Sequence, residues 1–159
     1  MARATLPKAE PELTEATLAA SRALLAVIAR SVAPALEQVS LPQLRVLVIL
    51  AGHGTTRSGT LAGLVGVHAS TFSRTTDRLV AGGWVRRVPN PHSRRETLVE
   101  LTDTGRRLVA SVMQRRRSEL AAILRRVAVE DRPAVRAAFE IFAGACGEPP
   151  LVDLAVLGV

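Results

Sequence analysis

The stretch Gly66–Gly105 constrains the fold of this chain more than any other part of the sequence. A hydroxyl-rich segment over residues 69–81 is followed by Gly82-Gly83, which predicts the end of a helix. Two strand-like runs, 84–88 and 97–101, flank a Pro-Asn-Pro turn, and a long segment of helical spacing follows them. This order of elements predicts a mainly α fold that contains a winged helix-turn-helix with a two-stranded β-wing.

Two helices are predicted before this stretch. From Leu13 onward, apolar residues recur in steps of three and four until Pro34, which should kink or end the helix because proline removes a backbone hydrogen bond. The next helix restarts at Leu41-Pro42, where proline is tolerated in the first turn, and stops at Gly52-His53-Gly54. It is apolar nearly all round and should be buried.

Three further helices complete the expected order. The first of them covers about 57–65, is capped by Thr55 or Thr56, and has three inward residues, Leu61, Leu64 and Val65. After the hairpin, Thr102 caps a helix whose apolar face continues to about Val127. Asp131 caps the last helix. The apolar side of that helix is formed by Val135, Phe139, Phe142 and Cys146.

These elements predict one domain at 13–147 between a flexible arm at 1–12 and a tail at 148–159. The winged helix-turn-helix covers about 41–102, and the helices at about 13–38 and 103–147 flank it. Their apolar stripes are too long for the central unit to cover, and an uncovered stripe of this size predicts a partner surface. A two-fold homodimer is the commonest solution, so we interpret both flanking regions as dimerisation helices. The alternative is that they pack on each other within one chain.

The helix over 69–81 has a polar face that suits DNA. Phe72, Thr75/Thr76 and Leu79 fall at inward spacing. The opposite face carries Ser70, Thr71, Ser73, Arg74, Asp77 and Arg78. Serine and threonine are poor helix formers, and a major groove would explain their presence, since hydroxyls bond phosphates and base edges and arginine binds guanine at two points. The alternative is a solvated polar face.

The hairpin supplies a second basic element. Arg94 and Arg95 lie at its tip, where an arginine can enter the minor groove; the alternative is a solubilising turn. Arg86 and Arg87 point to opposite faces of their strand, so at most one should meet phosphate. The chain carries a net charge of +7, which favours an anionic partner. Charge alone does not decide, because the near-exclusive use of arginine also follows from a GC-rich genome.

The segment DRLVAGGWVRRVPNPHSRRETLVELTDTG, residues 77–105, resembles the signature of the MarR family of bacterial transcription regulators, and the similar layout extends from about Leu13 to Cys146. The resemblance implies homodimers joined through their terminal helices. Such proteins commonly repress their own gene and neighbouring efflux, resistance or catabolic genes, and small phenolic or aromatic acids release many of them from DNA. It also implies that Asp77 and Arg95 form a charge pair that braces the wing. The chain departs from the family at Ser93, where aspartate is usual.

Other kinds of site are not expected. His53, His68 and His92 are far apart in the sequence and lack ligands at metal-binding spacing, so we predict no metal and no cofactor. Cys146 should be a small buried hydrophobe rather than a thiol sensor. No nucleophile or phosphate-loop motif is present, so we predict that the chain is not an enzyme. The single cysteine and the lack of a recognisable signal or membrane segment predict a cytoplasmic protein.

The sequence therefore favours a sequence-specific DNA-binding regulator, a homodimeric repressor that a small ligand releases from a near-palindromic operator. Three arginines are weak candidates for binding an acidic ligand: Arg22, Arg30 and Arg45. Two alternatives remain. One is an architectural protein that binds double-stranded DNA without sequence preference, and the other is a protein-interaction adaptor on the same fold.

Overall fold

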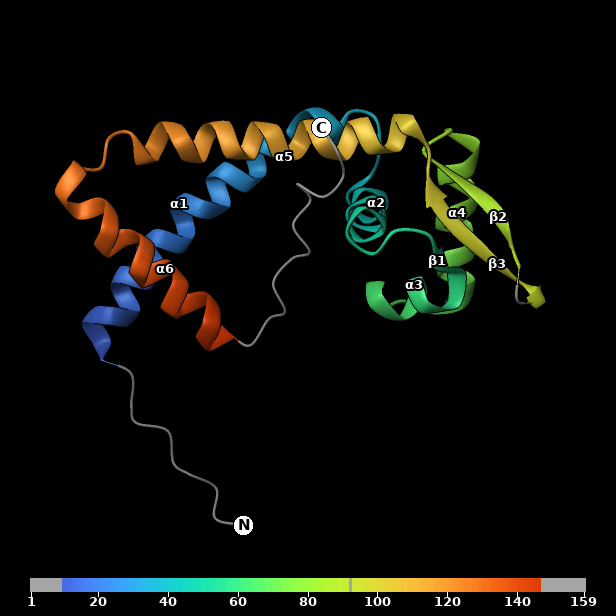
Figure 1. Ribbon diagram of the computed structural model, residues 1–159, viewed down its shortest axis with the longest axis horizontal. Coiled ribbons are helices and arrows are strands. Elements are labelled where there is room, and N and C mark those ends of the chain that lie inside the picture. The colour runs from blue at the N-terminus through green and yellow to red at the C-terminus, as the bar shows by residue number, and fades with distance from the viewer. Residues whose placement is uncertain (1–9, 92, 147–159) are drawn as a thin grey trace, which may run out of the picture.

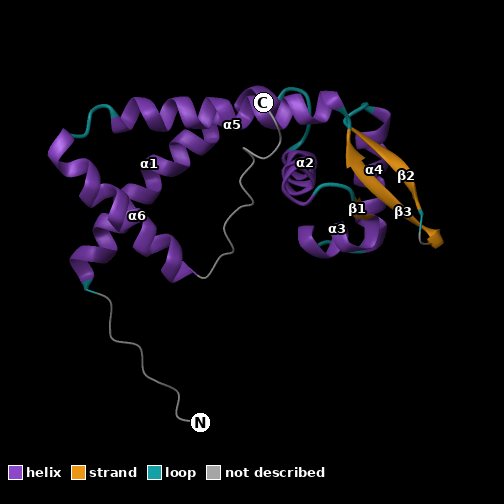
Figure 2. Cartoon of the chain, in the orientation of Figure 1, coloured by secondary structure: helices purple, strands orange, loops and turns teal. Residues whose placement is uncertain are grey.

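The computed structural model describes residues 10–91 and 93–146, without the side chains of Ala69, Arg94 and Arg95. In the order of the chain, the elements are α1 (Pro11–Leu36), α2 (Leu41–His53), β1 (Thr56–Arg57), α3 (Ser58–Val65), α4 (Ala69–Ala81), β2 (Val85–Asn90), β3 (Ser93–Leu101), α5 (Asp103–Leu124), a short 3-10 helix η1 (Val129–Asp131) and α6 (Arg132–Cys146). In Figure 1, α5 spans the molecule and joins a lobe of α2–α4 and the sheet to the helices α1 and α6. Figure 2 shows all strands at the lobe end. The mainly α fold with a winged helix-turn-helix is as predicted.

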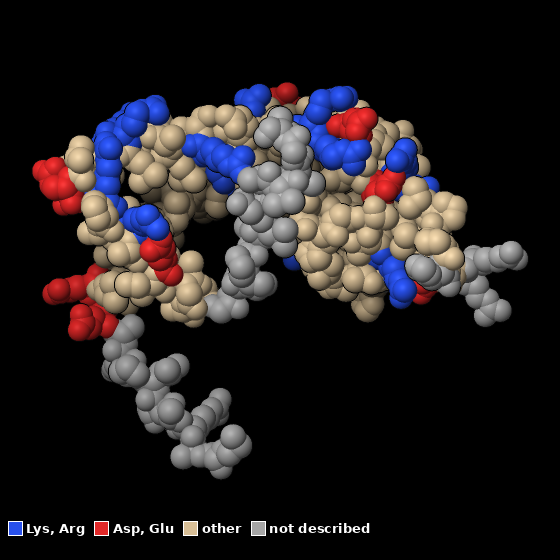
Figure 3. Space-filling view, in the orientation of Figure 1, with Lys and Arg blue, Asp and Glu red and all other residues tan. Residues whose placement is uncertain are grey.

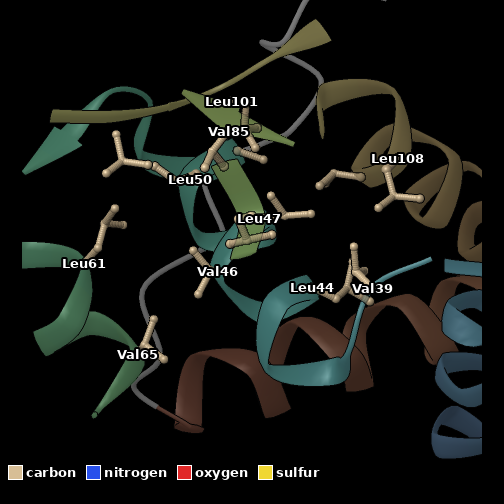
Figure 4. Close-up of a cluster of buried hydrophobic side chains, with 14 of the residues drawn as sticks. Val39, Leu44, Val46, Leu47, Leu50, Leu61, Val65, Val85, Leu101 and Leu108 are labelled. Atoms are coloured by element: carbon tan, nitrogen blue, oxygen red, sulfur yellow. The ribbon is translucent and has the colours of Figure 1, made fainter. Parts of the chain in front are cut away.

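The lobe is built around α2. Figure 4 shows α2 side chains grouped with residues of α3, the sheet and α5. The labelled members of this core are Val39, Leu44, Val46, Leu47, Leu50, Leu61, Val65, Val85, Leu101 and Leu108. Ser40 and Gln43 form a capping box at the start of α2, and Gly54 ends the helix with a positive φ of 70°. The prediction of a buried, nearly all-apolar helix that stops at these glycines is confirmed.

The sheet has three strands, in the order β1-β3-β2, rather than the two expected. The added strand comes from the residues that were assigned to a helix cap. Thr56 pairs with Val99 of β3, the Thr55 hydroxyl donates to Glu100 Oε2 at 2.9 Å, and α3 begins after Arg57 without a side-chain cap. The capping prediction is therefore wrong. Threonine favours strands as well as caps, and the open edge of β3 offers backbone partners that no local pattern reveals.

Further local predictions need correction. In α3, Leu61 and Val65 are buried as expected, but Leu64 is 41% exposed and Ala62 takes the third inward position. In α1, the helix does not end at Pro34, which was predicted to kink or end it, but continues through this residue to Leu36. Helix α1 begins at Pro11, inside the predicted arm, because proline is tolerated in the first turn of a helix. Residues 1–9 of the arm and the tail at 148–159 lie outside the described residues, so their conformation stays a prediction.

The second half of α1 packs against α5, and α1 diverges from α5 toward its own N-terminus, away from the lobe (Figure 1). The buried residues of α1 are Val27, Ser31 and Ala35. Two hydrogen bonds link the helices: Arg116 Nε of α5 donates to the Ser31 hydroxyl at 3.3 Å, and Arg30 Nε donates to Glu119 Oε2 of α5 at 2.6 Å. By length and composition α1 is apolar enough to cross a membrane, contrary to the expectation from sequence. This is weak support for a membrane segment, because core helices of soluble proteins meet the same criterion.

Within the described residues, α1 and α5 pack on each other, but much of the apolar surface of the flanking helices stays exposed. No residue of α6 is buried. The exposed large hydrophobic residues of these regions are Leu13, Leu18, Leu25, Ile28, Leu36, Ile123, Leu124, Val129, Phe139, Ile141 and Phe142. Cys146 is exposed too, so the prediction of a buried cysteine is wrong for the single chain, because none of the described helices buries any residue of α6.

Candidate nucleic-acid interface

Helix α4 is held in the lobe by one narrow face. Gly66 adopts a left-handed conformation with φ of 74°, and this allows the sharp turn between α3 and α4. Phe72, Thr76 and Leu79 are each at most 1% exposed, as their spacing predicted. The buried Thr76 hydroxyl donates to the carbonyl oxygen of Phe72 at 3.0 Å, so its burial leaves no polar group unpaired.

The opposite side of α4 faces solvent. At about 100° of rotation per residue, Ser70, Arg74, Arg78 and Thr71 fall on one outward arc, and all four are exposed. Ser73 and Asp77 are also exposed and lie at the edge of this arc. Arginine and lysine side chains, blue in Figure 3, lie over the lobe and also over the helices away from it. Charge is thus spread over the molecule, and the arc of α4 is distinguished by its mixture of hydroxyls and arginines.

The two arginines of β2 lie on opposite faces of the sheet, as alternation along a strand requires. Arg87 reaches α4, where its Nη2 donates to Asp77 Oδ1 at 2.7 Å. Arg86 faces Glu100, its cross-strand partner on β3, and its Nε donates to Glu100 Oε1. The β2 arginine on the side of α4 is therefore Arg87.

Ion pairs cover the other face of the sheet. Arg86 and the Thr55 hydroxyl both hydrogen-bond Glu100, and these two donors hold the pKa of its carboxyl below the usual range. Arg57 of β1 lies 3.3 Å from Glu96 of β3. Both arginines described on this face, Arg57 and Arg86, are paired with acids, which makes this part of the sheet a poor surface for phosphate.

A junction fixes α4, the wing and α5 relative to one another. The Thr102 hydroxyl accepts from the Gly105 amide at 3.1 Å and donates to the Gly83 carbonyl oxygen at 2.7 Å. A Cβ at Gly105 would lie 2.2 Å from the carbonyl oxygen of Trp84, so only glycine fits there. Sequence spacing predicted the cap at Thr102 but not its second bond, because Gly83 lies 19 residues away.

The structure places the predicted DNA-contacting residues in two groups. Ser70, Thr71, Ser73, Arg74 and Arg78 are exposed on α4. Arg94 and Arg95 have backbones in β3, next to the turn of the hairpin, and their side chains are outside those described. The brace between Asp77 and Arg95 stays a prediction for this reason. Sequence reasoning missed Arg87 as a partner of Asp77, although its place on the strand face opposite Arg86 was a usable signal.

The structure gives little support to the candidate ligand residues and leaves the predicted absence of a metal untested. Arg30 is engaged with Glu119, and Arg22 and Arg45 are exposed on α1 and α2. Within residues 10–91 and 93–146, no three His, Cys, Asp or Glu side chains are grouped closely enough to hold a metal ion. His92 lies outside the described residues, so the absence of a metal stays a prediction.

Comparison with known proteins agrees with this geometry. Residues 39–97 match the family model for the MarR family. The uncharacterized HTH-type transcriptional regulator Mb0904 of Mycobacterium bovis is 31% identical over 112 residues, which are 70% of this chain and 78% of that protein. The chain belongs to the MarR family. The match to another uncharacterized HTH-type regulator, YfiV of Bacillus subtilis, is 29% identical and spans 61% of each chain.

Solved structures of MarR-like proteins share the fold. RV1404 of Mycobacterium tuberculosis superposes with a TM-score of 0.81 and is 42% identical, covering 92% of this chain and all of that one. A cysteine-to-serine variant of MarR from E. coli, solved with operator DNA, has a TM-score of 0.53 and 21% identity over 83% of this chain and 94% of that one. At that identity the likeness concerns the fold alone. This chain is a MarR-family transcriptional regulator.

Proposed function

We propose that this MarR-family regulator binds a near-palindromic DNA operator as a homodimer and represses transcription until a small ligand releases it. The observation that carries the proposal is the outward arc of α4, on which Ser70, Thr71, Arg74 and Arg78 are exposed together while the opposite face is locked into the core. A rigid helix with short hydroxyls and arginines suits base edges and phosphates of a major groove. The operator complex of the E. coli MarR variant, which shares the fold, supports this reading.

The homodimer is supported by the uncovered apolar surface of α1, α5 and α6. Phe139 and Phe142 are 46% and 52% exposed on one face of α6, with Cys146 on the same face. A monomer would present this surface to water, whereas a two-fold partner would cover it. Two copies would then place two α4 helices in successive major grooves, about one helical turn of DNA apart.

Release by a ligand requires a difference in affinity between two states of the dimer. A small acid, phenolic or aromatic, would act by binding better to a dimer whose α4 helices have the wrong separation for DNA. Arg22 and Arg45 are exposed cations that could meet such an acid, whereas Arg30 would first have to leave Glu119. Such a repressor acts in the cytoplasm, and DNA, a second copy and the ligand are its partners. We propose no catalytic role.

The test is a titration of the purified protein against DNA from upstream of its own gene, with scrambled DNA as competitor at physiological salt. A preference of about a thousandfold or more is expected for a sequence-specific regulator. Equal, salt-sensitive binding to both DNAs would instead indicate the architectural protein. A folded dimer that binds neither DNA would indicate the adaptor.

A further inference from the structure

The exposed part of α4 carries a single acid, Asp77, and this acid meets the wing. Arg87 Nη2 lies 2.7 Å from Asp77 Oδ1, and the two side chains are 43% and 56% exposed. Asp77 lies one residue before Arg78 and three after Arg74, at the edge of the arc that faces outward. A carboxylate at this position is close to the surface that we assign to DNA.

The fold assigns one β2 arginine to each face of the sheet. Val85 is buried in the core, so Arg87, two residues later, lies on the same face and meets α4. Arg86 is held on the other face by Glu100. Because of this division, replacing Arg86 lowers the charge of the wing by as much as replacing Arg87 does, but it leaves the link to α4 intact.

The pair has two physical consequences. DNA phosphates would repel an unpaired Asp77 carboxylate, and the Arg87 guanidinium offsets the negative charge of that carboxylate. The pair also joins the middle of β2 to α4, so it sets the position of the wing relative to the helix. A half-exposed ion pair contributes little to folding stability, which means that its role in binding can be measured separately.

We propose that Arg87 is a positioning residue that acts through Asp77, and that the pair raises the selectivity of the protein for its operator rather than its overall affinity for DNA. This inference rests on the proposed function. With the pair intact, Asp77 keeps Arg87 on α4 and away from indiscriminate phosphate contacts. Without Asp77, Arg87 is free to bind any phosphate within its reach.

The experiment compares Asp77→Asn, Arg87→Ala and Arg87→Lys with the matched control Arg86→Ala, using full-length protein with operator and random duplexes over a range of salt. For Asp77→Asn we expect affinity for random DNA to rise by roughly threefold, the salt slope to steepen by about one, and the operator preference to fall by roughly tenfold. Arg87→Ala should weaken binding to the operator more than binding to random DNA, and Arg87→Lys should recover part of the lost preference. Thermal unfolding followed by Trp84, the only tryptophan, should change little in all variants.

Two results would overturn the inference while the proposed function stands. One is an operator preference in Asp77→Asn equal to that of the wild type. The other is a loss of preference in Arg86→Ala as large as in Arg87→Ala, because general wing charge would then explain both. If the wild type itself does not prefer its operator, the proposed function fails and the inference falls with it.

Discussion

The Thr102 hydroxyl lies 2.7 Å from the carbonyl oxygen of Gly83 and donates a hydrogen bond to it. The Thr102 hydroxyl oxygen also accepts a hydrogen bond from the Gly105 amide and thereby caps α5. One side chain therefore joins the turn after α4 to the start of α5, which is the helix that leads away from the lobe. This junction therefore constrains the direction of α5 relative to α4.

Replacing Thr102 with alanine should destabilise the protein. The variant loses a helix cap and a bond to Gly83, and the loss of a cap costs about 0.5–2 kcal/mol of folding free energy. Urea unfolding followed by Trp84 fluorescence measures the change. Thr104→Ala is the matched control, because Thr104 is exposed in the same turn and its described hydrogen bond is a 3.2 Å contact from the exposed Arg107. Equal stability of Thr102→Ala and wild type would show that the junction does not depend on this hydroxyl.

Replacing Arg74 with alanine should weaken operator binding by about 1–3 kcal/mol if the arginine reads a base, and should relax the preference at one position of each half-site. Arg74 is exposed on the outward arc of α4, so folding should be unaffected. Titrations against the operator and its single-base variants provide the measurement. Arg125→Ala, at the far end of α5, controls for loss of one positive charge. A uniform loss across all DNA sequences would assign Arg74 to phosphate instead.

The helices of the lobe were largely predictable because strong local sequence signals, such as glycines, mark where they begin and end. Helix α4 begins and ends as predicted, since Gly82-Gly83 stops it and Phe72 and Leu79 keep its core spacing. Strand β1 was missed because two residues carry no periodicity, and their pairing with β3 depends on chain that lies far away in sequence. Leu64 was misplaced for a related reason: an eight-residue helix permits more than one inward face.

The candidate site was predictable in its residue types and less so in its pairings. Exposure of Ser70, Thr71 and Arg74 follows from helical spacing alone. The link between Asp77 and Arg87 requires the angle between α4 and β2, which tertiary packing sets. The exposed Cys146 shows a further limit of prediction from sequence. Apolar spacing identifies a helix face that should be covered, but it does not indicate whether the same chain or a second copy covers it.

Acid should weaken the link between the sheet and the loop before α3. Arg86 and Thr55 lower the pKa of Glu100 in the folded state, so its contribution to stability is present above the unfolded value of about 4.5 and is lost as the pH falls through the lower folded value. Glu100→Gln should therefore be less stable than wild type at pH 7, and the difference should shrink below about pH 4.5. Thermal unfolding at pH 7 and at lower pH measures this. Glu140→Gln, which removes one partner of an exposed pair on α6, should show a much smaller difference at pH 7.

A charge on the apolar face of α6 should dissociate the dimer. Phe142 is 52% exposed in the single chain, and Phe142→Glu would place a carboxylate where a second copy is expected to bury an aromatic ring. Sedimentation velocity should show monomers for this variant at concentrations where the wild type is dimeric, and operator affinity should fall because both half-sites can no longer be held together. Ala143→Glu is the matched control, since this residue lies beside Arg136 and Glu140 on the polar edge of the helix. A Phe142→Glu protein that remains dimeric would show that the copies meet through another surface, and the exposed face of α1 would be the next to test.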